Sequence, residues 1–272
     1  RVGHPSVPEP FRSIGAVDGS FAPLSDLPYG PNPGGNKGWI YGTWGKVEPM
    51  RYNSPTDRDP TPDERNAAWA AQRINQFAQQ SDGKPFFLAV GCLRPHSPLH
   101  VPQRFFDMFP KDTLKLPVIK TGDAEDTHYA DVFSPEIKGL KYFRLLNESY
   151  PSLDDGIKAF LQAYLASIAA VDECVGQVVD AVDRTGLANN TIIVLTSDHG
   201  WNMCEKDYLF KNSLWEESTR VPLVIRAPGV TTKAGIVEHP VSLIDLYPTL
   251  KDLCGLKGTT LKNDKRWPKL EG

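Results

Sequence analysis

The chain has 272 residues, of which 40% are hydrophobic, so it is long enough to bury one large core. Its formal net charge of -3 gives no reason to expect a nucleic acid or an anionic membrane as partner. No stretch approaches the roughly 18 apolar residues that cross a bilayer, and residues 1–10 do not form a signal peptide. We therefore expect a globular protein with no nucleic-acid partner and no membrane span.

The four cysteines are widely scattered and include no C-x-x-C pair. This spacing favours buried or free thiols over a disulfide framework or a zinc finger. The 24 prolines are about twice the usual share, which indicates long ordered loops rather than a helical bundle.

The first predicted helix follows a long proline-rich and glycine-rich stretch. Residues 1–60 show neither helical nor strand periodicity, which predicts a loop region. Thr61 then offers an N-cap hydroxyl, Pro62 suits the first helical position, and Glu64 completes a capping pattern, so a helix should begin here. Its apolar stripe consists of Ala67, Ala71, Ile74 and Ala78.

Buried strands and helices alternate along the rest of the chain. The apolar runs 85–91, 191–196 and 222–229 are typical of strands that are covered on both faces. Apolar residues recur at helical spacing from Ile157 to near Gly186, and a second helix is predicted over 241–255, closing on Gly255. Residues 110–150 are mixed and irregular, and such a segment is often functional. The pattern predicts an α/β fold with a largely parallel sheet flanked by helices.

Chemically suggestive residues follow two of these strands, where α/β sheets gather their reactive groups. His96 lies in the sequence Arg-Pro-His-Ser-Pro after 85–91, and the two prolines stiffen that loop. Asp198 and His199 come directly after 191–196.

Residues alone leave two interpretations of this second group. Asp198 and His199 can converge on one metal, for which oxygen plus imidazole favours zinc or manganese over calcium, or they can cap and hydrogen-bond within the loop. Lys211 can bind an anion as a point charge or be a solvated surface lysine. His4, at the start of the chain, has no role that spacing alone would suggest.

Three ordered blocks of sequence resemble a known family. The stretches "PFFLAVGCLRPHSPLHVPQRFFDMFP", "TIIVLTSDHGW...EKDYLFKNSLWEESTRVPLVIRAPGV" and "VSLIDLYPTL" are similar to the sulfatase family of the alkaline-phosphatase superfamily, above all to iduronate-2-sulfatase-like enzymes. The resemblance is strongest over 85–110 and 190–250. It implies the alkaline-phosphatase-like fold.

The resemblance also implies a mechanism and roles for individual residues. In that family a formylglycine, installed by a formylglycine-generating enzyme, attacks the sulfur of a sulfate ester while one Ca2+ holds the sulfate oxygens. The resemblance implies that Asp198 and His199 bind this metal. It therefore favours calcium, where the residue types alone favoured zinc or manganese. His96 matches the sulfate-binding histidine, and Lys211 matches the lysine that contacts the sulfate and the leaving oxygen. His4 matches the histidine that helps to expel sulfate.

Several features depart from the family pattern. Arg1 stands where a lysine is expected, and Lys206 where a histidine is often found. No Cys/Ser-x-Pro-x-Arg nucleophile motif occurs, and the paired Asp-Asp that the family places near its N-terminus, after its first strand, to complete the metal site is absent. We therefore expect a partial sulfatase catalytic domain over 1–272, with an α/β core over 61–255 and a lead-in to a C-terminal subdomain over 256–272.

Three functional hypotheses follow. The first is a sulfatase that acts on sulfated carbohydrate or another sulfate ester, with its nucleophile upstream of this chain. The second is a phosphodiester or phosphonate monoester hydrolase of the same superfamily, and the third is a non-catalytic sulfated-glycan binder. The resemblance implies a periplasmic, secreted or lysosomal location.

Overall fold

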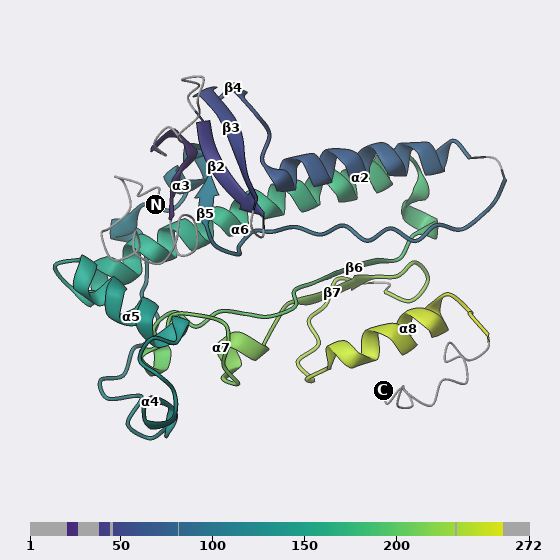
Figure 1. Ribbon diagram of the computed structural model, residues 1–272. Coiled ribbons are helices and arrows are strands. Elements are labelled where there is room, and N and C mark those ends of the chain that lie inside the picture. Colours follow the sequence, from purple (N-terminus) through teal and green to yellow (C-terminus); the bar gives the residue numbers. More distant parts are fainter. Residues whose placement is uncertain (1–20, 27–37, 44–45, 81, 232, 258–272) are drawn as a thin grey trace. The chain divides into compact units, whose positions relative to one another are not determined.

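The structure is a computed structural model that describes residues 21–26, 38–43, 46–80, 82–231 and 233–257 (Figure 1). The chain divides into two compact units, which are described separately. The first comprises residues 1–188 and 196–222, and the second comprises 189–195 and 223–272. Within the described ranges, no helix combines the length and the apolar character that crossing a membrane requires.

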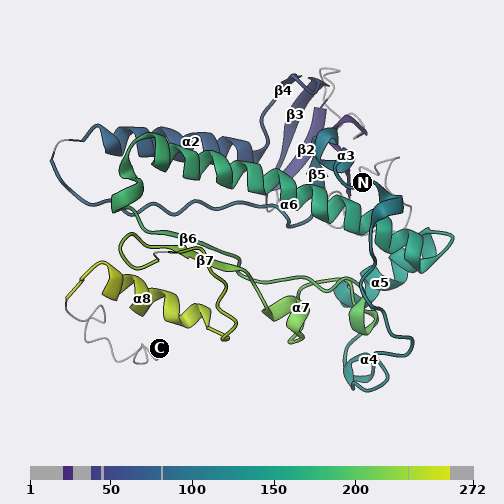
Figure 2. The same ribbon diagram turned by 180° about the vertical axis from the view of Figure 1, so that it is seen from behind.

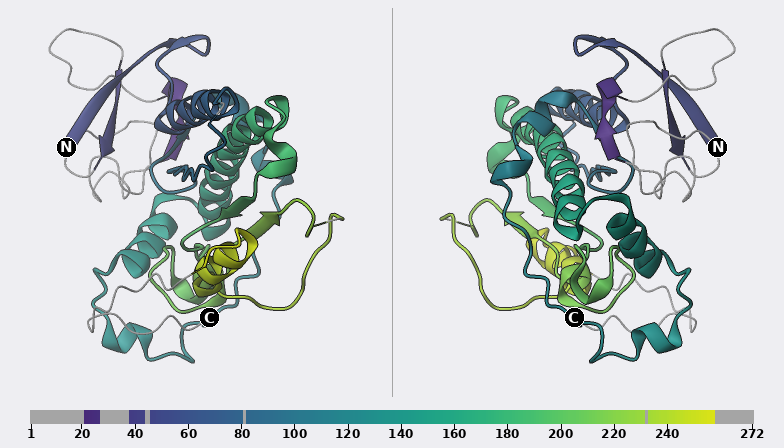
Figure 3. Two further views of the ribbon diagram at one scale, coloured as in Figure 1. Left: turned by 90° about the vertical axis from the view of Figure 1, so that its right-hand side faces the viewer. Right: turned by 90° about the vertical axis from the view of Figure 1, so that its left-hand side faces the viewer.

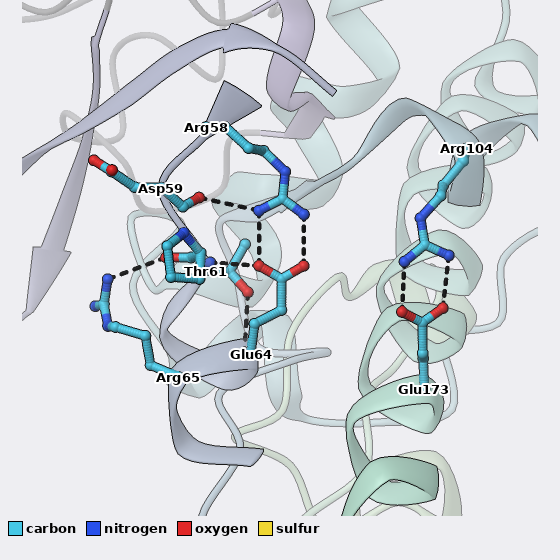
Figure 4. Close-up of polar contacts among 8 residues, drawn as sticks. Arg58, Asp59, Thr61, Glu64, Arg65, Arg104 and Glu173 are labelled. Carbon is cyan, nitrogen blue, oxygen red and sulfur yellow. Dashed lines mark hydrogen bonds and ion pairs between the residues drawn. The ribbon is translucent and has the colours of Figure 1, made fainter. Parts of the chain in front are cut away.

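Helix α2 (Pro62–Ala78) begins where the capping pattern predicts it. The Thr61 hydroxyl accepts a hydrogen bond from the Glu64 amide, and the Glu64 carboxylate accepts one from the Thr61 amide, which completes the capping box. The Glu64 carboxylate also receives two parallel bonds from the Arg58 guanidinium, 2.7 and 2.6 Å long (Figure 4). The predicted start of this helix is therefore confirmed.

The long helix α6 (Leu153–Arg184) forms the spine of the first unit. The Ser152 hydroxyl caps it by accepting from the Asp155 amide, and it ends before Gly186, whose φ of +77° is the left-handed conformation that favours glycine. Helix α2 lies along α6, as the opposite views of Figures 1 and 2 and the end-on views of Figure 3 all show. This confirms the helix predicted from Ile157 to near Gly186.

The region before residue 61 contains strands where a loop region was predicted. Strands β2 (Gly38–Thr43) and β3 (Lys46–Ser54) form an antiparallel pair that β4 (Asp57–Arg58) extends. Strand β1 (Phe21–Pro23) pairs in parallel with β5 (Leu99–Val101). Main-chain pairing makes these strands, so the missing side-chain periodicity did not reveal them.

The expected largely parallel sheet is not present as one sheet in the described residues. These contain a parallel pair, an antiparallel group of three, and the pair of β6 (Ile193–Thr196) with β7 (Leu223–Arg226). Residues 85–91, predicted to be a buried strand, are extended but join no ladder in the described part of the chain. Phe87 is accordingly 86% exposed.

The remaining helices are short, except for one that sequence analysis missed. Helix α5 (Lys138–Ser149) lies inside the stretch that was predicted to be irregular and packs against α6. In the second unit, α8 (Leu246–Leu253) follows a 3-10 turn and stops before Gly255, whose φ is +62°, in agreement with the helix predicted there. The other short helices are α3 (Gln103–Asp107), α4 (Tyr129–Val132) and α7 (Glu216–Thr219).

The core of the first unit joins α6 to the segment that follows Asp198 and His199. Phe160 of α6 stacks on Trp201, with ring centroids 6.1 Å apart, and Trp201 meets Phe210 edge to face at 5.2 Å. Tyr208 and Leu209 are fully buried beside them. The segment 201–210 is therefore fixed by aromatic packing rather than left as a free loop.

Candidate functional site

The turn that carries Asp198 and His199 is held by main-chain contacts. The Ser197 hydroxyl donates to the His199 carbonyl over 2.8 Å. The amides of Gly200 and Trp201 donate to the carbonyls of Ser218 and Glu217 over 2.7 and 2.6 Å. A Cβ on Gly200 would collide with the Glu217 carbonyl oxygen, so the glycine of Asp-His-Gly permits a close approach of two backbones.

Lys211 stands at the far end of a hairpin that begins at this turn. The Asn202 amide donates to the Phe210 carbonyl, and the Cys204 amide donates to the Tyr208 carbonyl, over 3.0 and 3.1 Å. Residues 200–204 therefore run antiparallel to 208–210. Lys211 directly follows the paired stretch.

The two histidines from different loops lie together. The ring centroids of His96 and His199 are 6.4 Å apart, with an interplanar angle of 62°. Nδ1 of His96 is 2.6 Å from the Ser97 carbonyl, and Nδ1 of His199 is 2.8 Å from the Gly200 carbonyl. A carbonyl only accepts, so both Nδ1 atoms carry a proton.

Asp198 and His199 have the chemistry and spacing of a pair of metal ligands. The Asp198 Oδ1 atom lies 3.7 Å from His199 Nε2. Two ligand atoms bound to one Ca2+ at about 2.4 Å each lie roughly 3–4 Å apart. The Asp198 side chain is 87% exposed and His199 28%, so both are accessible from solvent.

These two donors are only part of a coordination sphere. Within the described residues, no group of three or more His, Cys, Asp or Glu side chains converges as a metal site would require. Ca2+ takes six to eight oxygen ligands in proteins. Asp198 and His199 are thus two candidate ligands and not a complete metal site within the described residues.

A second lysine close to the hairpin has a different environment. The Lys206 ammonium bonds to Asp123 Oδ1 and to Asp126 Oδ1, each over 2.9 Å, and also to the Asp123 carbonyl over 3.0 Å. The bond to Asp126, and after it the bond to Asp123, raises the pKa of Lys206. The bond from Lys206 in turn lowers the pKa of Asp123. Lys206 is therefore a tether between the 120–127 segment and the hairpin.

Sequence analysis found some of these residues and missed others. His96, Asp198, His199 and Lys211 all belong to the first unit, and the two histidines are neighbours in it; their roles stay predictions. His4 lies outside the described residues. The tether was missed because Lys206 and Asp123 are 83 residues apart, and no local pattern connects them.

Comparison with known proteins supplies the family. The model of the sulfatase family matches residues 5–256. A sulfatase of Formosa agariphila is 38% identical over 201 residues, which are 72% of this chain and 37% of that protein. The iduronate 2-sulfatase of Mus musculus is 32% identical over 229 residues, covering 72% of this chain and 40% of that protein.

A solved structure gives a similar result for the fold. The phosphonate monoester hydrolase of Agrobacterium radiobacter is 29% identical and aligns with a TM-score of 0.57. The match covers 74% of this chain and 41% of that one. The chain thus spans about two fifths of the length of these three relatives.

Proposed function

Because this chain belongs to the sulfatase family, we propose that the protein containing it hydrolyses a sulfate ester, with His96, Lys211 and the Asp198–His199 pair around the sulfate group. The observation that carries the proposal is the 6.4 Å separation of the His96 and His199 rings, which come from two distant loops. Each loop supplies a residue type that the chemistry requires.

The chemistry explains why cationic donors should gather here. Cleavage of a sulfate ester spreads negative charge over the sulfuryl oxygens and the departing alkoxide. His96, as an imidazolium that carries hydrogens on both ring nitrogens, and the Lys211 ammonium would donate to those oxygens, and His4 would assist in releasing sulfate. A Ca2+ held by Asp198 Oδ1 and His199 Nε2, with further ligands from outside the described residues, would offset the charge of the sulfate group.

The nucleophile belongs to the same proposal. We infer a formylglycine, made by a formylglycine-generating enzyme, in a part of the protein other than these 272 residues, which lack the Cys/Ser-x-Pro-x-Arg motif. For the substrate we propose a sulfated carbohydrate, as the similarity to iduronate 2-sulfatase suggests. A periplasmic, secreted or lysosomal location would suit such a substrate.

Phosphonate monoester hydrolysis is a second candidate, favoured by the similarity to the Agrobacterium radiobacter enzyme. A sulfate monoester and a phosphonate monoester each carry one negative charge on a tetrahedral centre. His96 and Lys211 would suit either, so the reaction is decided by comparing the two substrates.

The test compares both esters in the natural gene product that contains this chain. We expect kcat/KM for 4-nitrophenyl sulfate to exceed that for 4-nitrophenyl phenylphosphonate, and we expect both to fall when a chelator removes Ca2+ and to recover when Ca2+ is restored. A preference for the phosphonate would favour the second candidate. Hydrolysis of neither ester, with Ca2+ bound, would contradict both.

A further inference from the structure

A buried carboxylate ties helix α2 to the loop that carries His96. Asp63, in the first turn of α2, is 5% exposed. Its Oδ1 atom accepts from the Leu93 amide over 2.7 Å, and its Oδ2 atom accepts from the Arg94 amide over 3.0 Å. One side chain thus fixes two successive peptides immediately before Pro95 and His96. Bonds to an ionised acceptor are stronger than neutral ones.

The same loop is braced from its other side by Arg94. Its guanidinium is buried, with the residue 7% exposed, and donates from Nη1 to the His96 carbonyl over 3.2 Å. Its Nη2 reaches the His100 carbonyl at 3.5 Å. Pro95 and Pro98 have no amide hydrogen to contribute, so contacts from side chains have a larger share in setting the shape of the loop.

The anchor itself is held rigidly. Asp63 lies between Thr61 and Glu64, whose reciprocal capping bonds and bidentate partner Arg58 fix the first turn of the helix (Figure 4). Burying a carboxylate costs free energy unless hydrogen bonds compensate for the lost water, and the two loop amides provide those hydrogen bonds. The cavity beside Asp63, Arg94 and His100 is only about 20 Å³, room for a single water and too small for a substrate.

We propose that Asp63 is a positioning residue for His96. By holding the Leu93 and Arg94 amides, it orients the loop so that His96 Nδ1 donates to the Ser97 carbonyl and Nε2 is presented to the ligand. Arg94 also helps to hold this loop conformation, because its guanidinium donates to the His96 carbonyl. The part of this inference that concerns sulfate rests on the proposed function, whereas the orientation of His96 does not.

The test measures the His96 tautomer by nitrogen-15 NMR of histidine-labelled chain, at one alkaline pH that is the same for every variant. The first variant is Asp63→Asn, which places an amide NH2 against one of the loop amides. The second is Arg94→Lys, which replaces the two-pronged guanidinium by a single ammonium. Glu64→Gln is the matched control, since it disturbs the same helix turn without touching the loop.

We expect the Nδ1–H form of His96 to predominate in the unmodified chain and in Glu64→Gln. Asp63→Asn should populate the Nε2–H form and speed hydrogen exchange at the Leu93 and Arg94 amides. An unchanged tautomer, despite faster exchange at those amides, would overturn the proposal. If Asp63→Asn does not fold, the tautomer in Asp63→Glu decides by the same criterion, because the longer side chain keeps the charge but displaces both oxygens from the two loop amides.

A second measurement separates this inference from the proposed function. Sodium sulfate, compared with sodium chloride at equal ionic strength, should shift the His96 signals saturably, with a dissociation constant about tenfold higher in Asp63→Asn. An equal constant in both chains would refute the effect of Asp63 on binding. No shift in the unmodified chain would contradict the sulfate-binding role of His96, while the tautomer would still decide whether Asp63 positions it.

Discussion

At the scale of single residues, the backbone sets the chemistry of both histidines. His96 and His199 each donate from Nδ1 to a neighbouring carbonyl, and these bonds fix the orientation of both rings. Lys206 is likewise defined by its surroundings, since Asp123 and Asp126 both bind its ammonium and make it a structural contact.

Gly200 provides a test at this scale. Gly200→Ala should lower the free energy of unfolding by about 1–3 kcal/mol, because the new methyl group must displace the Glu217 carbonyl. Gly176→Ala is the matched control, since a Cβ on this α6 glycine meets nothing within 4 Å and alanine favours a helix by up to about 1 kcal/mol. Urea denaturation of both variants checks this. Equal effects on stability would show that the contact at Gly200 is unimportant.

Local signals in the sequence suggested some candidate residues and not others. Asp198, His199 and His96 were predicted as candidates because they come shortly after apolar runs, and their roles stay predictions. Asp63 was not, because its partners are backbone amides 30 and 31 residues away, and any sequence has such amides. Arg94 was visible in the motif, but its bond to the His96 carbonyl depends on how the loop folds.

At the scale of elements, the start of α2 should depend on pH. Burial alone would raise the pKa of Glu64, but the bonds from Arg58 and the Thr61 amide outweigh it and leave this pKa lowered. The unfolded glutamate has a pKa of about 4.3, so its stabilising effect is full above that value and is lost as pH falls through the lower folded pKa.

Glu64→Gln isolates this contribution. At pH 7 the variant should be less stable than the unmodified chain by about 1–3 kcal/mol, the range for hydrogen bonds to charged groups. The difference should shrink as the pH falls below about 4. Urea denaturation at several pH values measures it. A difference that stays constant with pH would exclude the ionised Glu64–Arg58 contact as its origin.

The Lys206 tether makes a separate prediction about the 120–127 segment. Replacing both Asp123 and Asp126 by Asn should speed hydrogen exchange in residues 120–127 and 204–208, because the ammonium loses both charged partners. Asp131→Asn is the control, since that carboxylate is 82% exposed and its contact is with His128, 4.0 Å away. Unchanged exchange in the double variant would mean that packing alone holds the segment.

Whole elements differed in how far they could be predicted. Helices α2 and α6 have caps and apolar stripes of their own, so their sequences sufficed. Residues 85–91 have the composition of a buried strand, but a strand also needs a neighbour to pair with, and pairing is not encoded locally. Strands β2 and β3 were missed for the converse reason, because their pairing is visible only in the fold.

At the scale of the whole molecule, the chain is much shorter than the relatives that it matches. It spans about two fifths of the sulfatase relatives described above and lacks the nucleophile motif. We therefore expect the purified 272-residue chain to show no turnover of 4-nitrophenyl sulfate, even with Ca2+. Measurable turnover that copurifies with the folded chain would contradict the inference that the nucleophile lies elsewhere.

The most direct test of the central claim, that the His96 loop and the 198–211 hairpin form one sulfate-ester site, is the hydrolysis of 4-nitrophenyl sulfate by the natural gene product and its Lys211→Ala variant. We predict hydrolysis by the unmodified protein and a loss of about a hundredfold in kcat on removal of this donor. Lys115→Ala, at an exposed lysine, should have no effect. An unchanged kcat and kcat/KM in Lys211→Ala would contradict the account.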